Sequence, residues 1–368
     1  MNRLAEHAGT TPSYPARWWH TLDDGRIQCD LCPRECRLHD GQRGLCFVRA
    51  RQSDAMVLTT YGRSSGFCID PVEKKPLNHF YPGSSVLSFG TAGCNLSCKF
   101  CQNWDISKSR EMDRLQDQAS PEWIAKAARE MGCDSVAFTY NDPVIFAEYA
   151  MDTADACHAV GVKTVAVTAG YIHAEPRGEF YSKMDAANID LKAFTDDFYV
   201  RQTGAHLAPV LDTLQAVYHD TDCWLEITTL LIPGLNDSDA ELDAMTRWIA
   251  DHLDTEVPLH FTAFHPAYKL NDRERTPTDT VKRARHIALG NGLRHVYTGN
   301  IRDREGGMTA CAGCGKRLIE RDWHEIVCYS LNGQGACPDC GTRLAGRYAE
   351  KPGAFGRRRM PLKIRESS

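Results

Sequence analysis

The sequence predicts an α/β protein built on a parallel sheet that curls into a barrel or partial barrel, flanked by small cysteine-rich segments. Three observations support this fold class. From Gly83 to about residue 302, apolar strand-like runs alternate with helical segments, as in parallel sheets with helical crossovers. The 16 cysteines fall mainly into three groups, which lie before, within and after that region. Polar motifs follow the strands, where barrels carry their functional residues.

Composition limits the classes of protein to consider. The chain has 368 residues, of which 42% are hydrophobic, and a formal net charge of -5. This charge makes a nucleic-acid partner unfavourable. No apolar run approaches the ~18 residues of a membrane span, and residues 1–14 lack the apolar run of a signal peptide. We therefore expect a cytoplasmic protein without a membrane partner, in which reduced cysteines act as metal ligands.

The chain divides into five segments. Residues 1–55 form a cysteine-rich N-terminal segment whose beginning, to about residue 20, is expected to be poorly ordered. Residues 56–82 read as a proline-rich linker with a short strand at 57–61, and residues 83–302 as the core barrel. Residues 303–350 resemble a zinc ribbon, and residues 351–368 form a basic tail.

The elements of the core follow from apolar runs bounded by turn residues. We expect strands at 86–89, 135–138, 163–168, 187–191, 224–231, 259–264 and 295–297, and helices at 121–131, 144–160, 210–218, 239–253 and 278–289. Ser120 is the expected N-cap of the first helix, with Pro121 at its first position.

The cysteine loop Cys94-Asn-Leu-Ser-Cys98-Lys-Phe-Cys101 directly follows the first strand of the core. Three thiolates at C-x3-C-x2-C spacing can ligate three irons of a [4Fe-4S] cluster and leave the fourth iron open. A structural zinc site is the alternative, although structural zinc usually takes four protein ligands. The spacing, with Phe100 before the third cysteine, resembles the signature of the radical S-adenosylmethionine (SAM) superfamily. This resemblance implies a partial (β/α)6 TIM-like barrel whose open iron binds SAM.

The same resemblance assigns roles to residues at the strand ends. Asn141 and Asp142, after the second strand, would hydrogen-bond the SAM amino group, although many relatives carry Glu where this chain has Asp142. The alternative for Asp142 is the N-cap of the next helix. Asp190 and Lys192, two apart at the fourth strand, would face the SAM carboxylate and ribose or the substrate. A structural salt bridge is the alternative for this pair.

Later strands carry three further candidates. Glu226 lies on the fifth strand. It either has a functional role or forms an ion pair with Lys192. Ile232 follows that strand and would stack on the adenine. His265 follows the sixth strand and would lie near the SAM ribose, or be a structural histidine.

Two other cysteine groups flank the barrel. Cys311, Cys314, Cys337 and Cys340 form two C-x2-C knuckles, which indicate a structural zinc site, with rubredoxin-like iron as the lesser alternative. The N-terminal group offers four thiolates at C-x2-C-x3-C-x9-C spacing, suited to zinc or to one auxiliary iron–sulfur cluster. Its members are Cys29, Cys32, Cys36 and Cys46.

Further motifs resemble the radical SAM enzymes of the AmmeMemoRadiSam system, which are related to pyruvate formate-lyase activating enzymes. They are C-x2-C-P-R-x-C from Cys29, K-K-P-L-N-H-F-Y-P-G from Lys74, C-N-L-S-C-K-F-C-Q-N-W from Cys94, L-L-I-P-G-L-N-D-S from Leu230, V-P-L-H-F-T-A-F-H-P from Val257 and V-Y-T-G-N from Val296. The resemblance implies cleavage of SAM to a 5′-deoxyadenosyl radical that abstracts hydrogen from a small-molecule or protein substrate. It also implies an electron donor such as flavodoxin or ferredoxin, and Memo-like and AMMECR-like partners. The alternatives are an activase of a glycyl-radical enzyme and, less favoured, an iron–sulfur electron-transfer protein.

Overall fold

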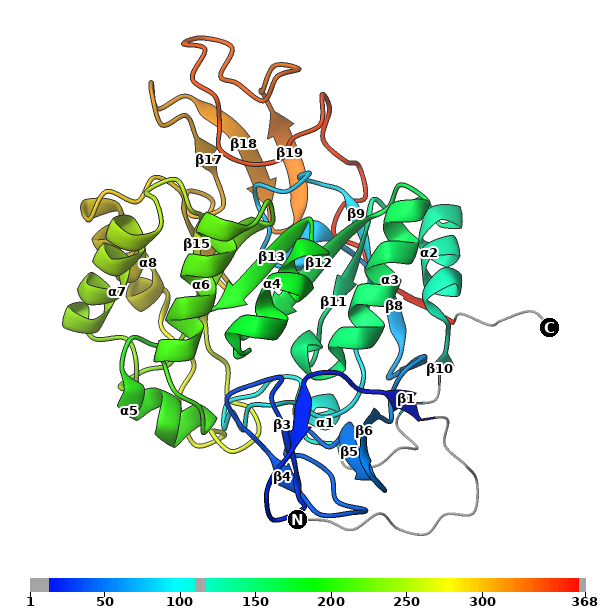
Figure 1. Ribbon diagram of the computed structural model, residues 1–368. Helices are drawn as coiled ribbons and strands as arrows, with labels where there is room; N and C mark the ends of the chain where they lie inside the picture. Colours follow the sequence, from blue (N-terminus) through cyan, green and yellow to red (C-terminus); the bar gives the residue numbers. More distant parts are fainter. Residues whose placement is uncertain (1–12, 110–114, 116, 364–368) are drawn as a thin grey trace.

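The computed structural model describes residues 13–109, 115 and 117–363. One nine-stranded sheet dominates it, in the order β16-β15-β14-β13-β12-β11-β9-β8-β20. The seven strands from β16 to β9 are parallel, whereas β8 and β20 are antiparallel to their neighbours. The sheet does not close on itself, so the predicted partial barrel is confirmed (Figure 1).

The core strands are β8 (Phe67–Pro71), β9 (Ser85–Phe89), β11 (Ser135–Phe138), β12 (Lys163–Thr168), β13 (Ala186–Asp190), β14 (Trp224–Leu231), β15 (Leu259–Ala263), β16 (Val296–Gly299) and β20 (Met360–Leu362). The helices are α1 (Trp104–Ser107), α2 (Pro121–Glu130), α3 (Ala147–Ala159), α4 (Ala174–Ser182), α5 (Asp196–Phe198), α6 (Ala208–Asp220), α7 (Asp239–His252) and α8 (Thr278–Gly290). Short 3-10 turns lie at η1 (Val72–Lys74) and η3 (Pro143–Phe146), and a π-helical turn lies at η4 (Tyr199–Thr203).

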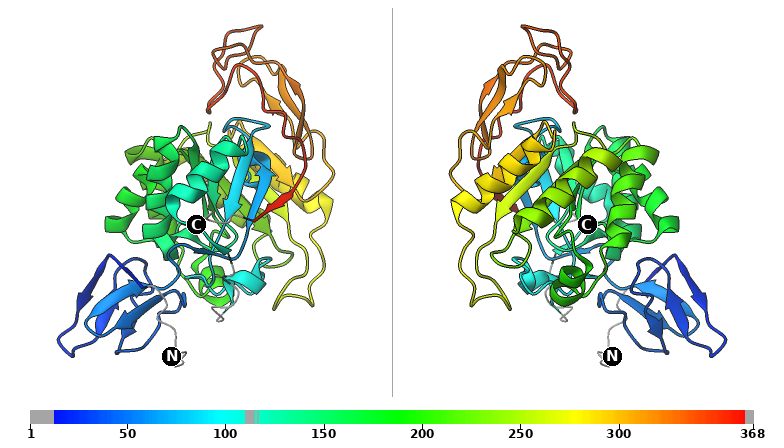
Figure 2. Two further views of the ribbon diagram at one scale, coloured as in Figure 1. Left: turned by 90° about the vertical axis from the view of Figure 1, so that its right-hand side faces the viewer. Right: turned by 90° about the vertical axis from the view of Figure 1, so that its left-hand side faces the viewer.

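Helices cover the outer face of the sheet (Figure 2). They begin where the sequence supplies caps: the Ser120 hydroxyl accepts from the Trp123 amide at 3.4 Å, and Ser238 caps α7 in the same way at 3.3 Å. The main hydrophobic core lies between these helices and the sheet. The inner face of the sheet carries a second, smaller apolar cluster, which fills only part of that face.

Residues 72–81 plug the inner side of the barrel, which corrects the expected linker over 56–82. Val72, Leu77 and Phe80 are buried and pack against Val86 and Val165 on the inner face of the sheet. Strand β8, just before the plug, pairs with β9. The prolines restrict the backbone of this segment, but its apolar side chains find a buried surface and fold it into the core.

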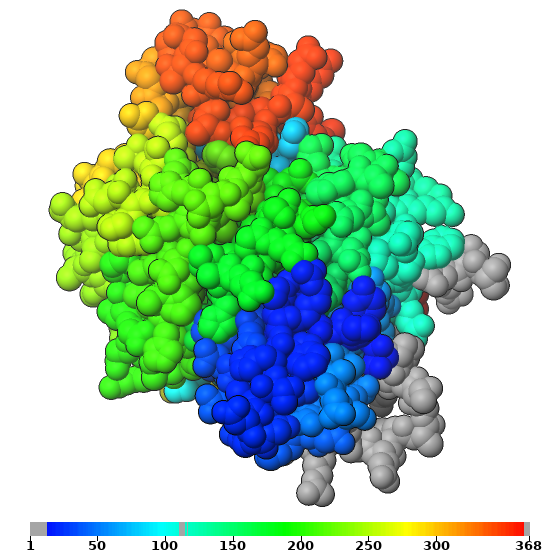
Figure 3. All heavy atoms as spheres, viewed as in Figure 1, coloured from blue at the N-terminus to red at the C-terminus, as the bar shows by residue number. Residues whose placement is uncertain are grey.

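The two flanking segments lie at opposite ends of the molecule (Figure 3). The N-terminal segment contains β1 (Tyr14–Pro15), β2 (Trp19–Thr21), β3 (Ile27–Cys29), β4 (Arg37–Leu38), β5 (Arg49–Gln52) and β6 (Ala55–Leu58). Residues 13–20 are thus folded, while residues 1–12 of the expected disordered lead-in lie outside the described part. The short strands β7 (Arg63–Ser64) and β10 (Asp117–Gln118) pair with each other.

The C-terminal ribbon consists of β17 (Thr309–Ala310), β18 (Arg317–Asp322) and β19 (Glu325–Tyr329) in one antiparallel sheet. The basic tail then returns along the barrel, and its strand β20 pairs with β8. Residues 360–362 thus complete the edge of the central sheet, with Met360 and Pro361 still exposed to solvent. The tail beyond residue 363 lies outside the described residues.

Candidate active site

The cysteine loop leaves the carboxyl end of β9 and is fixed by backbone hydrogen bonds. The Ser97 amide donates to the Thr203 carbonyl at 2.7 Å, and the Lys99 amide donates to the Gln202 carbonyl at 2.9 Å. Gly93, just before the first cysteine, has a φ of +81°, and a Cβ there would lie 1.9 Å from the Cys46 carbonyl oxygen. Only glycine fits this approach, so the loop is held directly against the N-terminal segment.

The three thiols of this loop lie in a setting that suits metal ligation. Burial, together with the Asp142 carboxylate, raises the pKa of Cys94 to about 12. Burial also raises the pKa of Cys98, although Lys192 and Lys108 oppose that shift. The Leu96 amide donates to Cys94 Sγ at 3.4 Å, and the Ser107 hydroxyl lies 3.0 Å from Cys101 Sγ.

Buried thiols of this kind ionise when a metal replaces the proton. Backbone and hydroxyl groups next to Cys94 and Cys101, with cations beside Cys98, then stabilise thiolates. The donor set therefore fits a [4Fe-4S] cluster with three protein ligands.

Asn141 and Asp142 lie behind the cysteine loop. The Asn141 amide nitrogen donates to Thr91 Oγ1 and to the Gly93 carbonyl, at 3.1 and 3.0 Å, while its oxygen accepts from the Thr91 amide at 3.0 Å. Its side chain is thus engaged with the loop, and its expected contact with SAM stays a prediction. We assign it to positioning the loop.

Asp142 connects the ends of β11 and β12. Its carboxylate accepts from the Val144 amide at 3.1 Å, the Thr168 hydroxyl at 2.9 Å and the Ala169 amide at 2.8 Å. The first bond confirms the N-cap interpretation, here for η3. Burial raises the pKa of Asp142, and the three donors oppose this shift.

Asp190 and Lys192 form an ion pair at the end of β13, with 2.8 Å between Lys192 Nζ and Asp190 Oδ2. Burial lowers the pKa of Lys192, but Asp190 and the Cys98 thiolate outweigh this effect and raise it overall. A lysine ammonium therefore faces the cysteine loop. Lys192 also donates through its backbone amide to Tyr199 Oη at 3.0 Å.

The remaining candidates are Ile232, Phe100 and His265, which lie in three different segments of the chain. Ile232 is fully buried, and its amide donates to Asn236 Oδ1 at 2.7 Å. Asn236 in turn donates to the carbonyls of Lys192 and Leu230, at 2.7 and 2.9 Å, so it organises the segment after β14. Phe100 is buried with its ring 5.8 Å from that of Phe198. His265 is half-buried, and burial together with Arg275 lowers its pKa.

A cavity of about 1200 Å³ occupies the barrel interior. Gln102 and Asn103, which directly follow the third cysteine, line one part of it. Thr139, Val167 and His260 line it from the strands. The ribbon and tail reach it through Arg321, Trp323, His324, Arg357 and Arg359. The cavity therefore extends from the cysteine loop to the C-terminal segments and is large enough for a small-molecule ligand.

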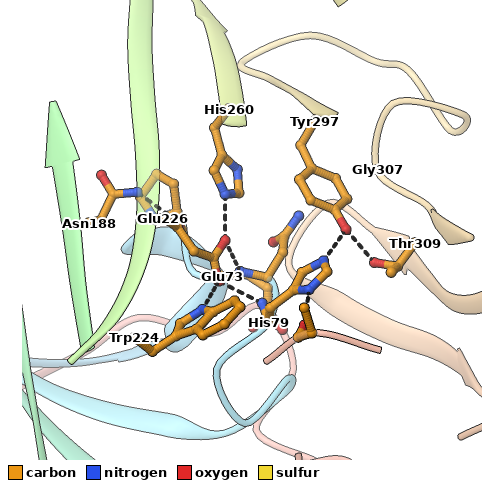
Figure 4. A network of polar contacts seen from close by, with 12 residues as sticks. Glu73, His79, Asn188, Trp224, Glu226, His260, Tyr297, Gly307 and Thr309 are labelled. Carbon is orange, nitrogen blue, oxygen red and sulfur yellow. Dashed lines mark hydrogen bonds and ion pairs between the residues drawn. The ribbon is translucent and has the colours of Figure 1, made fainter. Parts of the chain in front are cut away.

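Glu226 is the centre of a buried polar network beside this cavity (Figure 4). Its carboxylate accepts from the amides of Asn78 and His79, at 2.9 and 2.7 Å, and from Trp224 Nε1 at 3.1 Å. It also lies 2.7 Å from His260 Nε2. The expected pairing of Glu226 with Lys192 is therefore wrong, because the plug supplies backbone donors and Lys192 pairs with Asp190.

The network continues from the plug into the ribbon. His79 Nδ1 lies 2.6 Å from the Ala345 carbonyl, and its Nε2 lies 2.5 Å from Tyr297 Oη. Since a carbonyl only accepts, Nδ1 carries the proton and Nε2 accepts from the tyrosine. Tyr297 lies 2.7 Å from Thr309 Oγ1, to which Arg321 donates at 2.9 Å. Burial and the neighbouring His295 lower the pKa of His79 well below its usual range.

The flanking cysteine groups differ in their spacing. The sulfur atoms of Cys311, Cys314, Cys337 and Cys340 all lie within 4.8 Å of one another, as one tetrahedral ion requires. The N-terminal cysteines gather around a small enclosed cavity instead, which all four line. The spacing of cysteines along the sequence predicts both the ribbon group and the N-terminal group. It does not show that their sulfur atoms are arranged differently in space.

The chain is similar to a known family and to several known proteins. Residues 89–245 match the model of the radical SAM superfamily. An uncharacterized protein of Methanocaldococcus jannaschii is 37% identical over 330 residues, which cover 89% of this chain and 98% of that protein. The 4-hydroxyphenylacetate decarboxylase activating enzyme of Clostridioides difficile is 21% identical over 55% of this chain and 70% of its own length.

Among solved structures, a radical SAM methyltransferase from Sphaerobacter thermophilus aligns with a TM-score of 0.47 and 17% identity. The alignment covers 83% of this chain and 81% of that one.

No helix among the described residues is long and apolar enough to cross a membrane. The chain belongs to the radical SAM superfamily, and it is homologous to the activating enzymes of glycyl-radical enzymes.

Proposed function

We propose that this chain cleaves SAM at a [4Fe-4S] cluster held by Cys94, Cys98 and Cys101, and that it acts on a substrate bound in the barrel cavity. One observation carries the proposal: Gln102 and Asn103, next to the third cysteine, line the same 1200 Å³ cavity as His260 and Val167. A radical formed at the loop would therefore arise next to this cavity. The bound cluster and SAM would supply the one-electron cleavage that yields methionine and a 5′-deoxyadenosyl radical.

The residues of the chain have separate tasks in this proposal. Asn141 and Asp142 fix the loop to the ends of β11 and β12 through the hydrogen bonds described above. Lys192 supplies positive charge next to Cys98 and, with Asp190, offers groups that complement the carboxylate and amine of SAM. Ile232 would pack on the adenine and His265 would lie near the ribose. The walls of the cavity would orient the C–H bond to be attacked.

The size of the cavity favours one class of substrate. A small molecule fits within 1200 Å³, whereas a protein substrate would have to insert a loop or an end. We favour a small molecule. Activation of a glycyl-radical enzyme is the second candidate, since relatives of this chain are activating enzymes.

We also propose that the chain acts within an AmmeMemoRadiSam system with Memo-like and AMMECR-like partners, since its motifs resemble those enzymes. A flavodoxin or ferredoxin would deliver the electron in the cytoplasm. All 16 cysteines are unpaired, which suits a reducing compartment. Zinc in the ribbon is supported by Sγ separations of 3.5 Å for Cys311–Cys340 and 3.7 Å for Cys314–Cys337.

The test is anaerobic. The protein is reconstituted with iron and sulfide, dithionite and SAM are added, and 5′-deoxyadenosine is measured. We expect production that a Cys94/Cys98/Cys101 triple-alanine variant lacks. Equal production by that variant would refute the cluster assignment. SAM binding by the wild type without any cleavage, under strongly reducing conditions and with candidate substrates, would count against the enzymatic function.

A further inference from the structure

We propose that Cys29, Cys32, Cys36 and Cys46 hold a second iron–sulfur cluster rather than a zinc ion. The four residues line one enclosed cavity in the N-terminal segment, which Leu31, Leu38 and Ile145 close with apolar side chains. Cys29, Cys32 and Cys46 are buried. A cavity lined by four thiols suits a bound inorganic cluster, whose ligands are cysteine thiolates.

The spacing of the sulfur atoms argues against a single ion. A tetrahedral zinc site with Zn–S bonds of about 2.3 Å places its sulfurs about 3.8 Å apart. The ribbon cysteines meet this condition, because all four of their sulfurs lie within 4.8 Å of one another. Among the described residues, neither the N-terminal group nor the Cys94 group forms such a compact set. The N-terminal group thus shares its wider spacing with the loop proposed to hold a cluster.

The surroundings of the sulfurs also suit a cluster. The Leu45 amide donates to Cys36 Sγ at 3.4 Å. Hydrogen bonds of this kind to the sulfurs tune iron–sulfur clusters. The buried guanidinium of Arg49 lines the same cavity and pairs with Glu148 at 2.9 Å, so positive charge lies next to the thiolates.

The second site lies against the first. Asn95, which directly follows Cys94, lines the cavity of the N-terminal cysteines. Arg34 Nε donates to the Asn95 carbonyl at 2.6 Å, and the Cys46 carbonyl occupies the space that a side chain at Gly93 would need. The two sites therefore share a wall. The proposal does not rest on SAM cleavage, because it concerns only what these four cysteines bind.

The decisive protein is the full chain carrying Cys94→Ala, Cys98→Ala and Cys101→Ala, since these changes leave the N-terminal cysteines intact. After anaerobic reconstitution, iron, acid-labile sulfide and zinc are counted per chain, and the dithionite-reduced protein is examined by EPR. We expect iron and sulfide in equal numbers, about two or four each, with a cluster signal. We also expect about one zinc, in the ribbon. Adding Cys36→Ser to this variant should remove the iron and sulfide, whereas adding Cys133→Ser, outside every group, should not.

Two results would overturn the proposal. The first is about two zinc ions per chain without sulfide, which would make the N-terminal group a second zinc site. The second is iron without sulfide, which would indicate a single rubredoxin-like ion. A Cys311→Ser/Cys314→Ser variant identifies the ribbon metal separately, because it should lose zinc and keep its iron and sulfide.

Discussion

Replacing Glu226 by glutamine should strongly destabilise the fold, although the change preserves size and shape. The Glu226 side chain is fully buried and accepts four hydrogen bonds. Each carboxylate oxygen takes two of them, and a glutamine amide turns one oxygen into a donor that faces two other donors. Hydrogen bonds to a charged acceptor contribute about 1.5–3 kcal/mol each. The loss of two should therefore lower the free energy of unfolding by about 3–6 kcal/mol.

Urea unfolding followed by tryptophan fluorescence measures this change, and the melting temperature provides a second readout. For a domain of this size, 1 kcal/mol corresponds to about 2–4 °C, so the melting temperature should fall by at least about 6 °C. Glu179→Gln is the matched control. Glu179 is 40% exposed and pairs with Arg17, and such surface pairs contribute at most about 1 kcal/mol. A Glu226→Gln variant as stable as this control would refute the reasoning.

Three further predictions concern the site and its surroundings. Cys98→Ala should lose both the iron of the SAM cluster and the production of 5′-deoxyadenosine, and cleavage at the wild-type rate would contradict the assignment. Asp142→Asn should lose the hydrogen bond from the Ala169 amide, which should lower the free energy of unfolding in urea by about 1.5–3 kcal/mol. An unchanged urea midpoint would show that this bond does not stabilise the fold. Burial raises the pKa of Glu73 from 4.5 to about 7, so the folded state binds an extra proton between these values and stability should fall as pH rises through this window. The urea midpoint of Glu73→Gln should vary less between pH 4.5 and 7 than that of the wild type, and parallel profiles would exclude Glu73 as the titrating group.

The parallel strands could be predicted closely because their signal is local. The expected ranges 135–138, 163–168 and 224–231 coincide with β11, β12 and β14. Runs of apolar and β-branched residues bounded by turn residues specify buried strands without reference to the rest of the chain. Helix α4 was missed because its sequence, A-E-P-R-G-E-F-Y-S, contains proline and glycine and lacks a helical apolar period.

The partners of buried charges could not be predicted, since they depend on tertiary contacts. Glu226 takes its backbone donors from Asn78 and His79, 148 and 147 residues away in the sequence. No spacing rule connects positions that far apart. Strand β8 was hidden for a similar reason, because one of its two partners is β20, which lies near the other end of the described chain.

The contacts between the plug and the ribbon also determine the order in which the chain can complete its fold during synthesis. Arg321 donates to the Asn78 carbonyl across 243 residues, and His79 contacts the Ala345 carbonyl across 266. While the ribosome is still adding the core strands, the plug has none of these partners. The plug can reach its final contacts only after the ribbon has emerged. A nascent chain that ends at residue 302 thus carries an unfinished barrel, which the ribbon completes once it has been made.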